Sequence, residues 1–306
     1  MRATLRLSVL GCLMGSAALL ALAGVSVAQN APPPDHPSVT VKGQTYTPRS
    51  ILARNMGTDA DQTTQFPPHK IIGNIYYVGT KTLSSFLIVT PQGNILIDST
   101  YERNVPVIKK SVEDLGFKFT DVKILLGNHA HGDHQEGDAA VKQLTGAQVV
   151  VMAEDVPALQ AIKPGGKDHP IDKVIHDGDK VTLGNVTLTA HLTAGHTRGC
   201  TTYTTTVQDG GRNYNVMFGC SLRPGLTVPP AVEAEFNRSF KVVRTLPCDV
   251  QLGDHGAQYN MQAKYAKLSS GGPNPFVDPA SCMNEADVEE AMFHAILAEQ
   301  AAAAKK

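Results

Sequence analysis

A run of histidines directly after an apolar segment constrains this chain more than any other feature. Residues 122–126 (VKILL) are typical of a buried β-strand, and residues 128–134 (NHAHGDH) follow them almost at once. A loop that starts at the carboxyl end of a strand can direct its side chains to one point. A solvated loop has no need of this spacing, so the run predicts a metal site whose ligands are His129, His131, Asp133 and His134.

Two histidines further along the chain stand in similar surroundings. His196 lies in the sequence LTAGHT and His255 in LGDHG, and each follows a predicted strand. The neighbouring glycines allow the backbone to approach a crowded centre. Either histidine alone would more often be a core or surface residue, but together with the run at 129–134 we expect both to be ligands.

The order of predicted elements indicates a mixed α/β domain in which two sheets are covered by helices. Apolar runs and turn residues predict strands and helices in an order that repeats along the chain. The strands are expected at 71–78, 85–90, 94–98, 122–126, 149–152, 180–182, 186–193 and 248–252, and the helices at 104–115, 138–144, 155–161 and from Asn284 as N-cap onward.

A β-hairpin organises the cysteines of the second half. Residues 201–207 and 213–219 are β-rich and flank the turn sequence DGG at 209–211. Pairing about Gly210 would place Cys200 directly opposite Cys220, within reach of a disulfide. We therefore predict the bridge Cys200–Cys220, which leaves Cys248 to pair with Cys282.

The histidine pattern resembles the metal-binding set of the metallo-β-lactamase superfamily, and the chain is more closely similar to class B β-lactamases of the third subclass (B3). The resemblance covers residues 66–283 and includes the sequences SFLIVTP at 85–91, ILID at 95–98, TAGHT at 193–197 and YNMQAK at 259–264. It implies a four-layer αββα sandwich with two zinc ions in the groove between the sheets.

The resemblance also implies which residues hold each ion. One zinc would be bound by His129, His131 and His196, and the other by Asp133, His134 and His255. Ser221 falls where the B3 subclass has a serine near the second zinc, and we expect it to bind substrate. In the first lactamase subclass a cysteine of this strand is a zinc ligand; the predicted disulfide favours a bridge for Cys220 instead.

The activity that this set implies is hydrolysis of the β-lactam amide of penicillins, cephalosporins and carbapenems by a metal-bound hydroxide. Zinc lowers the pKa of bound water, and Asp133 would be both a ligand and the catalytic residue that orients the hydroxide. The main alternative is a thioesterase or lactonase of the same superfamily, similar to glyoxalase II. A zinc-binding protein without catalytic turnover is a further alternative, which the open coordination positions disfavour.

Two further charged residues lie near these motifs. Arg223 could pair with a substrate carboxylate or stand in a solvated loop, and the two interpretations carry equal weight. Glu136 could support a ligand, although an acidic residue at the start of the helix at 138–144 is the favoured role. At 135–137 the sequence is QEG, where the resemblance leads us to expect small residues.

The N-terminal residues predict export. Residues 1–28 combine Arg2 and Arg6, an apolar stretch and the small-residue site Ser26-Val27-Ala28, which we interpret as a cleaved signal peptide in preference to a membrane anchor or a lipid attachment at Cys12. We expect residues 29–65 to be an extended segment and residues 66–306 to form the catalytic domain. The protein would then be a periplasmic or secreted monomer that confers antibiotic resistance and has no membrane contact after cleavage.

The net charge of −1 and the lack of a basic stripe argue against nucleic acid as a partner, so the substrate is expected to be a small molecule.

Overall fold

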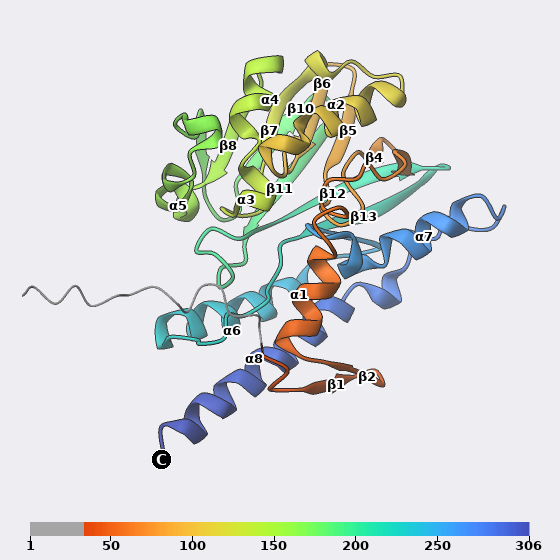
Figure 1. Ribbon diagram of the computed structural model, residues 1–306. Coiled ribbons are helices and arrows are strands. Elements are labelled where there is room, and N and C mark those ends of the chain that lie inside the picture. Colours follow the sequence, from red (N-terminus) through yellow and green to blue (C-terminus); the bar gives the residue numbers. More distant parts are fainter. Residues whose placement is uncertain (1–33, 306) are drawn as a thin grey trace, which may run out of the picture. The chain divides into compact units, whose positions relative to one another are not determined.

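The computed structural model describes residues 34–305 (Figure 1). The predicted signal peptide and its cleavage site lie outside these residues. Among the described helices, none is both long enough and apolar enough to cross a bilayer.

The first sheet has seven strands in the order β3-β4-β5-β6-β7-β8-β9. The pairs from β3 to β6 are antiparallel, whereas β6, β7, β8 and β9 run parallel to one another. The carboxyl ends of these four strands therefore meet at one edge of the sheet. The strand bounds are β3 His69–Ile72, β4 Ile75–Tyr77, β5 Phe86–Thr90, β6 Gly93–Ile97, β7 Val122–Leu126, β8 Gln148–Met152 and β9 Lys173–Ile175.

The second sheet has five strands in the order β10-β11-β12-β13-β14. Since β11 and β13 are both antiparallel to β12, and β14 is parallel to β13, the carboxyl ends of β11, β13 and β14 also share one edge. The strand bounds are β10 Lys180–Leu183, β11 Val186–Leu192, β12 Thr201–Asp209, β13 Arg212–Gly219 and β14 Val250–Gly253. A separate pair, β1 Val39–Val41 and β2 Gln44–Tyr46, forms a small two-stranded sheet.

Eight α-helices accompany the sheets in the described part of the chain. Five precede or follow strands of the first half: α1 Pro48–Met56, α2 Val105–Asp114, α3 Gly132–Gln135, α4 Asp138–Thr145 and α5 Val156–Ala161. The other three are α6 Pro230–Thr245, α7 Met261–Leu268 and α8 Asn284–Ala303.

Three buried clusters define the layers of the fold. The largest joins the inner faces of the two sheets, for example Ile88 of β5 with Leu188 of β11. Because side chains alternate along a strand, Leu87 points to the opposite face, where it belongs to a cluster with Ile108 of α2. The third cluster packs Met217 of β13 against residues of α6 and α8. Helices therefore cover the outer face of each sheet, and the predicted αββα sandwich is confirmed (Figure 1).

Two local differences from the sequence-based expectations have physical causes. The single strand expected at 71–78 is a hairpin of β3 and β4, because the chain turns at Gly73, whose φ of 53° suits glycine. The described part of the segment expected to be extended, 29–65, contains β1, β2 and α1. Thr47 and Ser50 form a capping box at the start of α1, with Pro48 at its first position.

The predicted disulfides Cys200–Cys220 and Cys248–Cys282 are both present, with Cα–Cα distances of 5.9 and 6.2 Å. The register that led to the first of them is wrong by one residue. The turn has two residues, Gly210 and Gly211, with φ of 55° and 80°, and Asp209 pairs with Arg212. The ladder ends before the cysteines, so the bridge joins residues that do not face each other in the ladder.

Candidate metal centre

Strand ends bring the predicted ligands together. The loop after β7 carries His129 and His131, and the short helix α3 that follows carries Asp133 and His134. In the second sheet, His196 follows β11 and His255 follows β14. The edges at which these strands end face a common site, as ligand sites at the carboxyl ends of strands generally do.

The six predicted ligands form two adjacent groups. One consists of His129, His131 and His196, and the other of Asp133, His134 and His255; within each group the potential ligand atoms lie within 4.8 Å of one another. The groups adjoin, because the ring centroids of His129 and His134 are 4.1 Å apart. The same two sets are the ones that the family resemblance implies. A third group of similar size, His129, His134 and Asp254, overlaps both.

The chemistry of these groups fits zinc. Five imidazoles and one carboxylate are donors that zinc prefers, and three protein ligands per ion leave room for water or substrate. Nε2 of His134 is buried and makes no hydrogen bond, although Asp133 Oδ2 lies 3.3 Å away. A buried polar atom without a partner is costly, and a cation at this point would remove that cost.

Asp98 was not predicted as a site residue and supports the second group from β6. Its Oδ2 lies 3.2 Å from Nδ1 of His134, and its Oδ1 accepts a hydrogen bond of 2.8 Å from the backbone N–H of Asn128. The carboxylate thus fixes the ring of His134 with Nε2 directed away from it, toward Asp133. The backbone of Asp98 has a φ of 61°, an uncommon conformation for a residue with a side chain.

Two other buried aspartates, Asp254 and Asp155, fix loops of the metal centre through hydrogen bonds. Asp254 Oδ2 accepts a hydrogen bond of 2.8 Å from the backbone N–H of Ser221 and lies 3.4 Å from Nδ1 of His129. Asp155, directly after β8, accepts hydrogen bonds from the backbone of Ala130 and from Thr197 at 2.8 and 2.9 Å, and so links the first histidine loop to the loop of His196. Sequence reasoning missed both; the only signal was their position after predicted strands.

Burial and neighbouring charges set the protonation of the ligands. Burial, with a further contribution from His134, lowers the pKa of His129 to about 3, and burial lowers the pKa of His255 to about 4. Both rings are therefore neutral at pH 7, which is the form that binds metals. Burial opposes ionisation of Asp133, but the neighbouring histidines, His134 foremost, outweigh it and hold the pKa of this carboxyl well below its usual value.

A cavity of about 210 Å³ opens onto the ligands. Its wall includes members of both groups together with Ser221 and Arg223, and α1 closes one side with Leu52, Asn55 and Met56. The N-terminal segment therefore contributes to the site, which the sequence did not indicate.

Ser221 and Arg223, the two candidate substrate-binding residues, both lie in the wall of this cavity, but their polar groups are used differently. The hydroxyl of Ser221 donates a hydrogen bond of 2.9 Å to Glu289 of α8. The backbone carbonyl of Arg223 accepts a hydrogen bond of 2.9 Å from Nδ1 of His196. Burial lowers the pKa of the Arg223 guanidinium, and within residues 34–305 this group forms no ion pair. Arg223 is a half-buried cation in the wall of the cavity, where a ligand can reach it.

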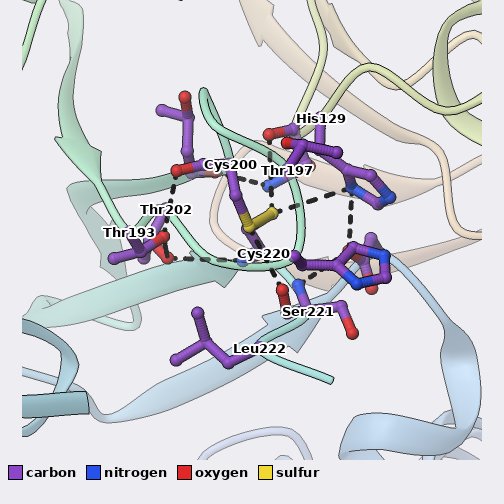
Figure 2. Close-up of a disulfide and its surroundings, with 12 residues drawn as sticks. His129, Thr193, Thr197, Cys200, Thr202, Cys220, Ser221 and Leu222 are labelled. Atoms are coloured by element: carbon purple, nitrogen blue, oxygen red, sulfur yellow. Dashed lines mark hydrogen bonds and ion pairs between the residues drawn. A yellow bond between two sulfur atoms is a disulfide. The ribbon is translucent and has the colours of Figure 1, made fainter. Parts of the chain in front are cut away.

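Cys220 and Glu136 are not among the groups that could hold a metal in the described chain. Figure 2 shows the Cys200–Cys220 disulfide beside the imidazole of His129; the sulfur of Cys220 is 3.7 Å from its Nδ1. A sulfur in a disulfide is not a thiolate ligand. Glu136 lies between α3 and α4, where its carboxylate accepts a 3.4 Å hydrogen bond from the backbone of Glu102.

Comparison with known proteins agrees with this architecture. The family model described as the metallo-beta-lactamase superfamily matches residues 79–209. The native FEZ-1 metallo-beta-lactamase from Legionella gormanii superposes with a TM-score of 0.75 at 43% sequence identity, over 78% of this chain and 98% of that one. The chain therefore belongs to the metallo-beta-lactamase superfamily.

Within the superfamily, the structural likeness is to subclass B3. BJP-1, a subclass B3 metallo-beta-lactamase of Bradyrhizobium japonicum, superposes with a TM-score of 0.73 at 38% identity, over 79% of this chain and 98% of that one. Hydroxyacylglutathione hydrolase of Rhodospirillum rubrum is also similar, at 32% identity over 93 residues, or 30% of this chain. The chain spans about a third, or less, of the length of the curated relatives it matches.

Proposed function

We propose that this chain is a zinc-dependent β-lactamase that opens the four-membered amide ring of penicillins, cephalosporins and carbapenems and so confers antibiotic resistance. The observation that carries the proposal is the convergence of two three-residue ligand groups on one cavity that Arg223 also lines. The extensive likeness to metallo-beta-lactamases supports the choice of substrate.

The protein would hold two zinc ions, one on His129, His131 and His196 and the other on Asp133, His134 and His255. Zinc, when bound, lowers the pKa of a water ligand toward about 7 and polarises a carbonyl oxygen. Asp133 remains ionised at neutral pH, and a carboxylate at this position can orient the attacking water by accepting its hydrogen bond.

The cavity wall would bind the rest of the substrate. β-Lactam antibiotics carry a carboxylate next to the lactam nitrogen, and a guanidinium suits a carboxylate because its N–H groups can donate two parallel hydrogen bonds. Arg223 is therefore assigned to this carboxylate. Leu52 and Met56 of α1 provide apolar surface for the substituents of the ring, and Ser221 completes the wall nearby.

The second candidate is a thioesterase, because the matches to hydroxyacylglutathione hydrolases include this type of activity in their names. Those matches cover only 25–30% of this chain, whereas the likeness to FEZ-1 covers 78%. The two disulfides also suit an oxidising compartment better than a reducing one. A periplasmic or secreted monomer, released after residue 28, remains the expected form of the protein.

A hydrolysis assay tests the proposal. The purified protein is expected to hydrolyse nitrocefin and a carbapenem, to lose activity with a chelator and to regain it with zinc. A glutathione thioester serves as the competing substrate. Rapid thioester cleavage without hydrolysis of any lactam would contradict the proposal and support the second candidate.

A ligand variant tests the assigned site directly. We expect His131→Ala to lower kcat/KM by at least about a hundredfold and to reduce bound zinc. Removing a ligand weakens zinc binding more than removing a residue that only orients a ligand. His176→Ala is the matched control, since His176 is exposed and outside the site. Full activity of zinc-loaded His131→Ala would argue against the assigned ligands.

A further inference from the structure

A buried glutamate of α8 holds a chain segment, residues 221–223, that adjoins the metal centre. Glu289 is 2% exposed, and both of its carboxylate oxygens are used. Oε1 accepts a hydrogen bond of 2.9 Å from the hydroxyl of Ser221, and Oε2 accepts one of 2.8 Å from the backbone N–H of Leu222. A single side chain thus fixes two successive residues directly after β13.

The segment held by Glu289 contacts one predicted ligand directly and a second one through Asp254. On one side, the carbonyl of Arg223 accepts the hydrogen bond from Nδ1 of His196, which leaves Nε2 of that ring free for a metal. On the other side, the backbone N–H of Ser221 donates to Asp254, which faces His129. A shift of residues 221–223 would therefore be transmitted to two ligands of the same group and to the guanidinium of Arg223.

The position of Glu289 is not explained by packing alone. Burying a carboxylate is costly unless it is fully hydrogen-bonded, and an apolar side chain would fill this space in α8 at lower cost. Glu285, one turn earlier, is paired with Arg54, whereas no ion pair joins Glu289 to another residue of the range 34–305. Burial, together with the nearby charge of Glu285, raises the pKa of Glu289. The direct contacts that Glu289 makes with residues 221–223 are its two hydrogen bonds.

We propose that Glu289 is a positioning residue of the metal centre: through Ser221 and Leu222 it sets the orientation of His196 and the place of Arg223 in the cavity. The inference rests on the proposed function only where it concerns the β-lactam carboxylate. Its consequence for zinc binding is independent of the substrate.

Two substitutions of Glu289 test the inference. Glu289→Leu removes both hydrogen bonds, and we expect zinc affinity, measured by competition with a fluorescent chelator, to fall about tenfold, as when the partner of a metal ligand is lost. KM for an anionic β-lactam at saturating zinc is expected to rise more than kcat falls. Glu289→Gln should restore both values, because its amide oxygen can accept from Leu222 and its amide N–H can donate to Ser221.

Ile296→Ala is the matched control. Ile296 is buried on α8 two turns beyond Glu289, so its truncation destabilises the helix without touching residues 221–223. If Glu289→Leu lowers the unfolding temperature as Ile296→Ala does but leaves zinc affinity and KM at the wild-type values, the proposal is wrong. A folded Glu289→Gln variant that is as impaired as Glu289→Leu would also overturn it.

Two outcomes need a separate readout. If Glu289→Leu does not fold, Ser221→Ala removes one of the two hydrogen bonds and should give a smaller loss of zinc affinity; an unchanged affinity would again overturn the proposal. If the wild type binds zinc but hydrolyses no lactam, the proposed function fails, and the chelator competition still decides whether Glu289 positions the metal ligands.

Discussion

The assigned ligands depend on neighbouring residues that were not predicted to orient them. Asp98 contacts His134, Asp254 contacts His129, and the carbonyl of Arg223 contacts His196. In each case the contact is made through Nδ1, so that Nε2 is the free nitrogen of the ring. The tautomer that binds zinc is therefore set by neighbours contributed from other parts of the chain.

Asp98→Asn tests this dependence at one ligand. The asparagine oxygen can still accept from the backbone of Asn128, which leaves its amide N–H₂ opposite Nδ1 of His134. This arrangement favours the tautomer with hydrogen on Nε2, which cannot bind a metal. We expect zinc affinity to fall by about 10- to 100-fold with little loss of folded protein. Wild-type affinity in a zinc titration would show that Asp98 does not orient the ring.

Arg223→Ala tests the assigned substrate contact. A hydrogen bond to a charged group contributes about 1.5–3 kcal/mol, so we expect KM for carboxylate-bearing lactams to rise about tenfold to a hundredfold with kcat less affected. Arg223→Lys should recover part of the loss, since it keeps the charge but not the paired donors. An equal rise in KM for a lactam ester that lacks the carboxylate would contradict the assignment.

At the scale of elements, strand direction explains why distant residues meet. The parallel strands β6, β7 and β8 end at one edge, so Asp98, the histidine loop and Asp155 lie together although more than 50 residues separate the first from the last. The sequence predicted most strands of both sheets but, apart from the hairpin of β12 and β13, not which strands pair with which. It also did not predict α6, although Pro230 begins that helix and Phe236, Phe240 and Val243 follow helical spacing on its buried side.

A histidine outside the metal centre connects α4 to the loop before β9. Nε2 of His169 lies 3.3 Å from Asp138 and 3.1 Å from the carbonyl of Gln135. Burial alone would lower the pKa of His169. Asp138 and the backbone carbonyls of Gln135 and Pro170 outweigh this effect and raise the pKa above its ordinary value. Folding therefore stabilises the protonated form of His169 relative to the neutral form.

This linkage gives a pH-dependent stability. The contribution of His169 is complete below an unfolded-state pKa of about 6.5 and is lost as the pH rises through the raised pKa. We expect His169→Gln to lower the free energy of unfolding by on the order of 1 kcal/mol at pH 6 and by less at pH 9. Urea unfolding of both proteins at fixed zinc measures the difference. A difference that does not change with pH would rule out this role.

At the scale of the whole molecule, the disulfide Cys248–Cys282 connects the start of β14 to the start of α8. It closes a loop with a sequence separation of 34 residues, for which the chain-entropy model gives about 4 kcal/mol. We expect the double variant Cys248→Ser and Cys282→Ser to lose about 2–4 kcal/mol of stability in denaturant unfolding and to keep its zinc content. Unchanged stability would show that packing alone anchors α8.

The sequence by itself determined the candidate ligands, the αββα class and the pairing of the cysteines. Each of these depends on short-range patterns: residue spacing within a loop, alternation along a strand, and a hairpin turn that limits which cysteines can meet. The predicted bridge Cys200–Cys220 is present although the predicted register of the hairpin is wrong by one residue. The distance that a disulfide can span tolerates that error.

Only the tertiary structure decided which residues support the ligands and which enclose the cavity. Asp155, Asp254 and Glu289 come from strand ends and from a helix near the C-terminus, and no local pattern distinguishes a buried carboxylate from an exposed one. The same is true of α1, whose Leu52 and Met56 close the cavity. A carboxylate acquires such a role from the donors that surround it after folding, and those donors come from segments far away in the chain.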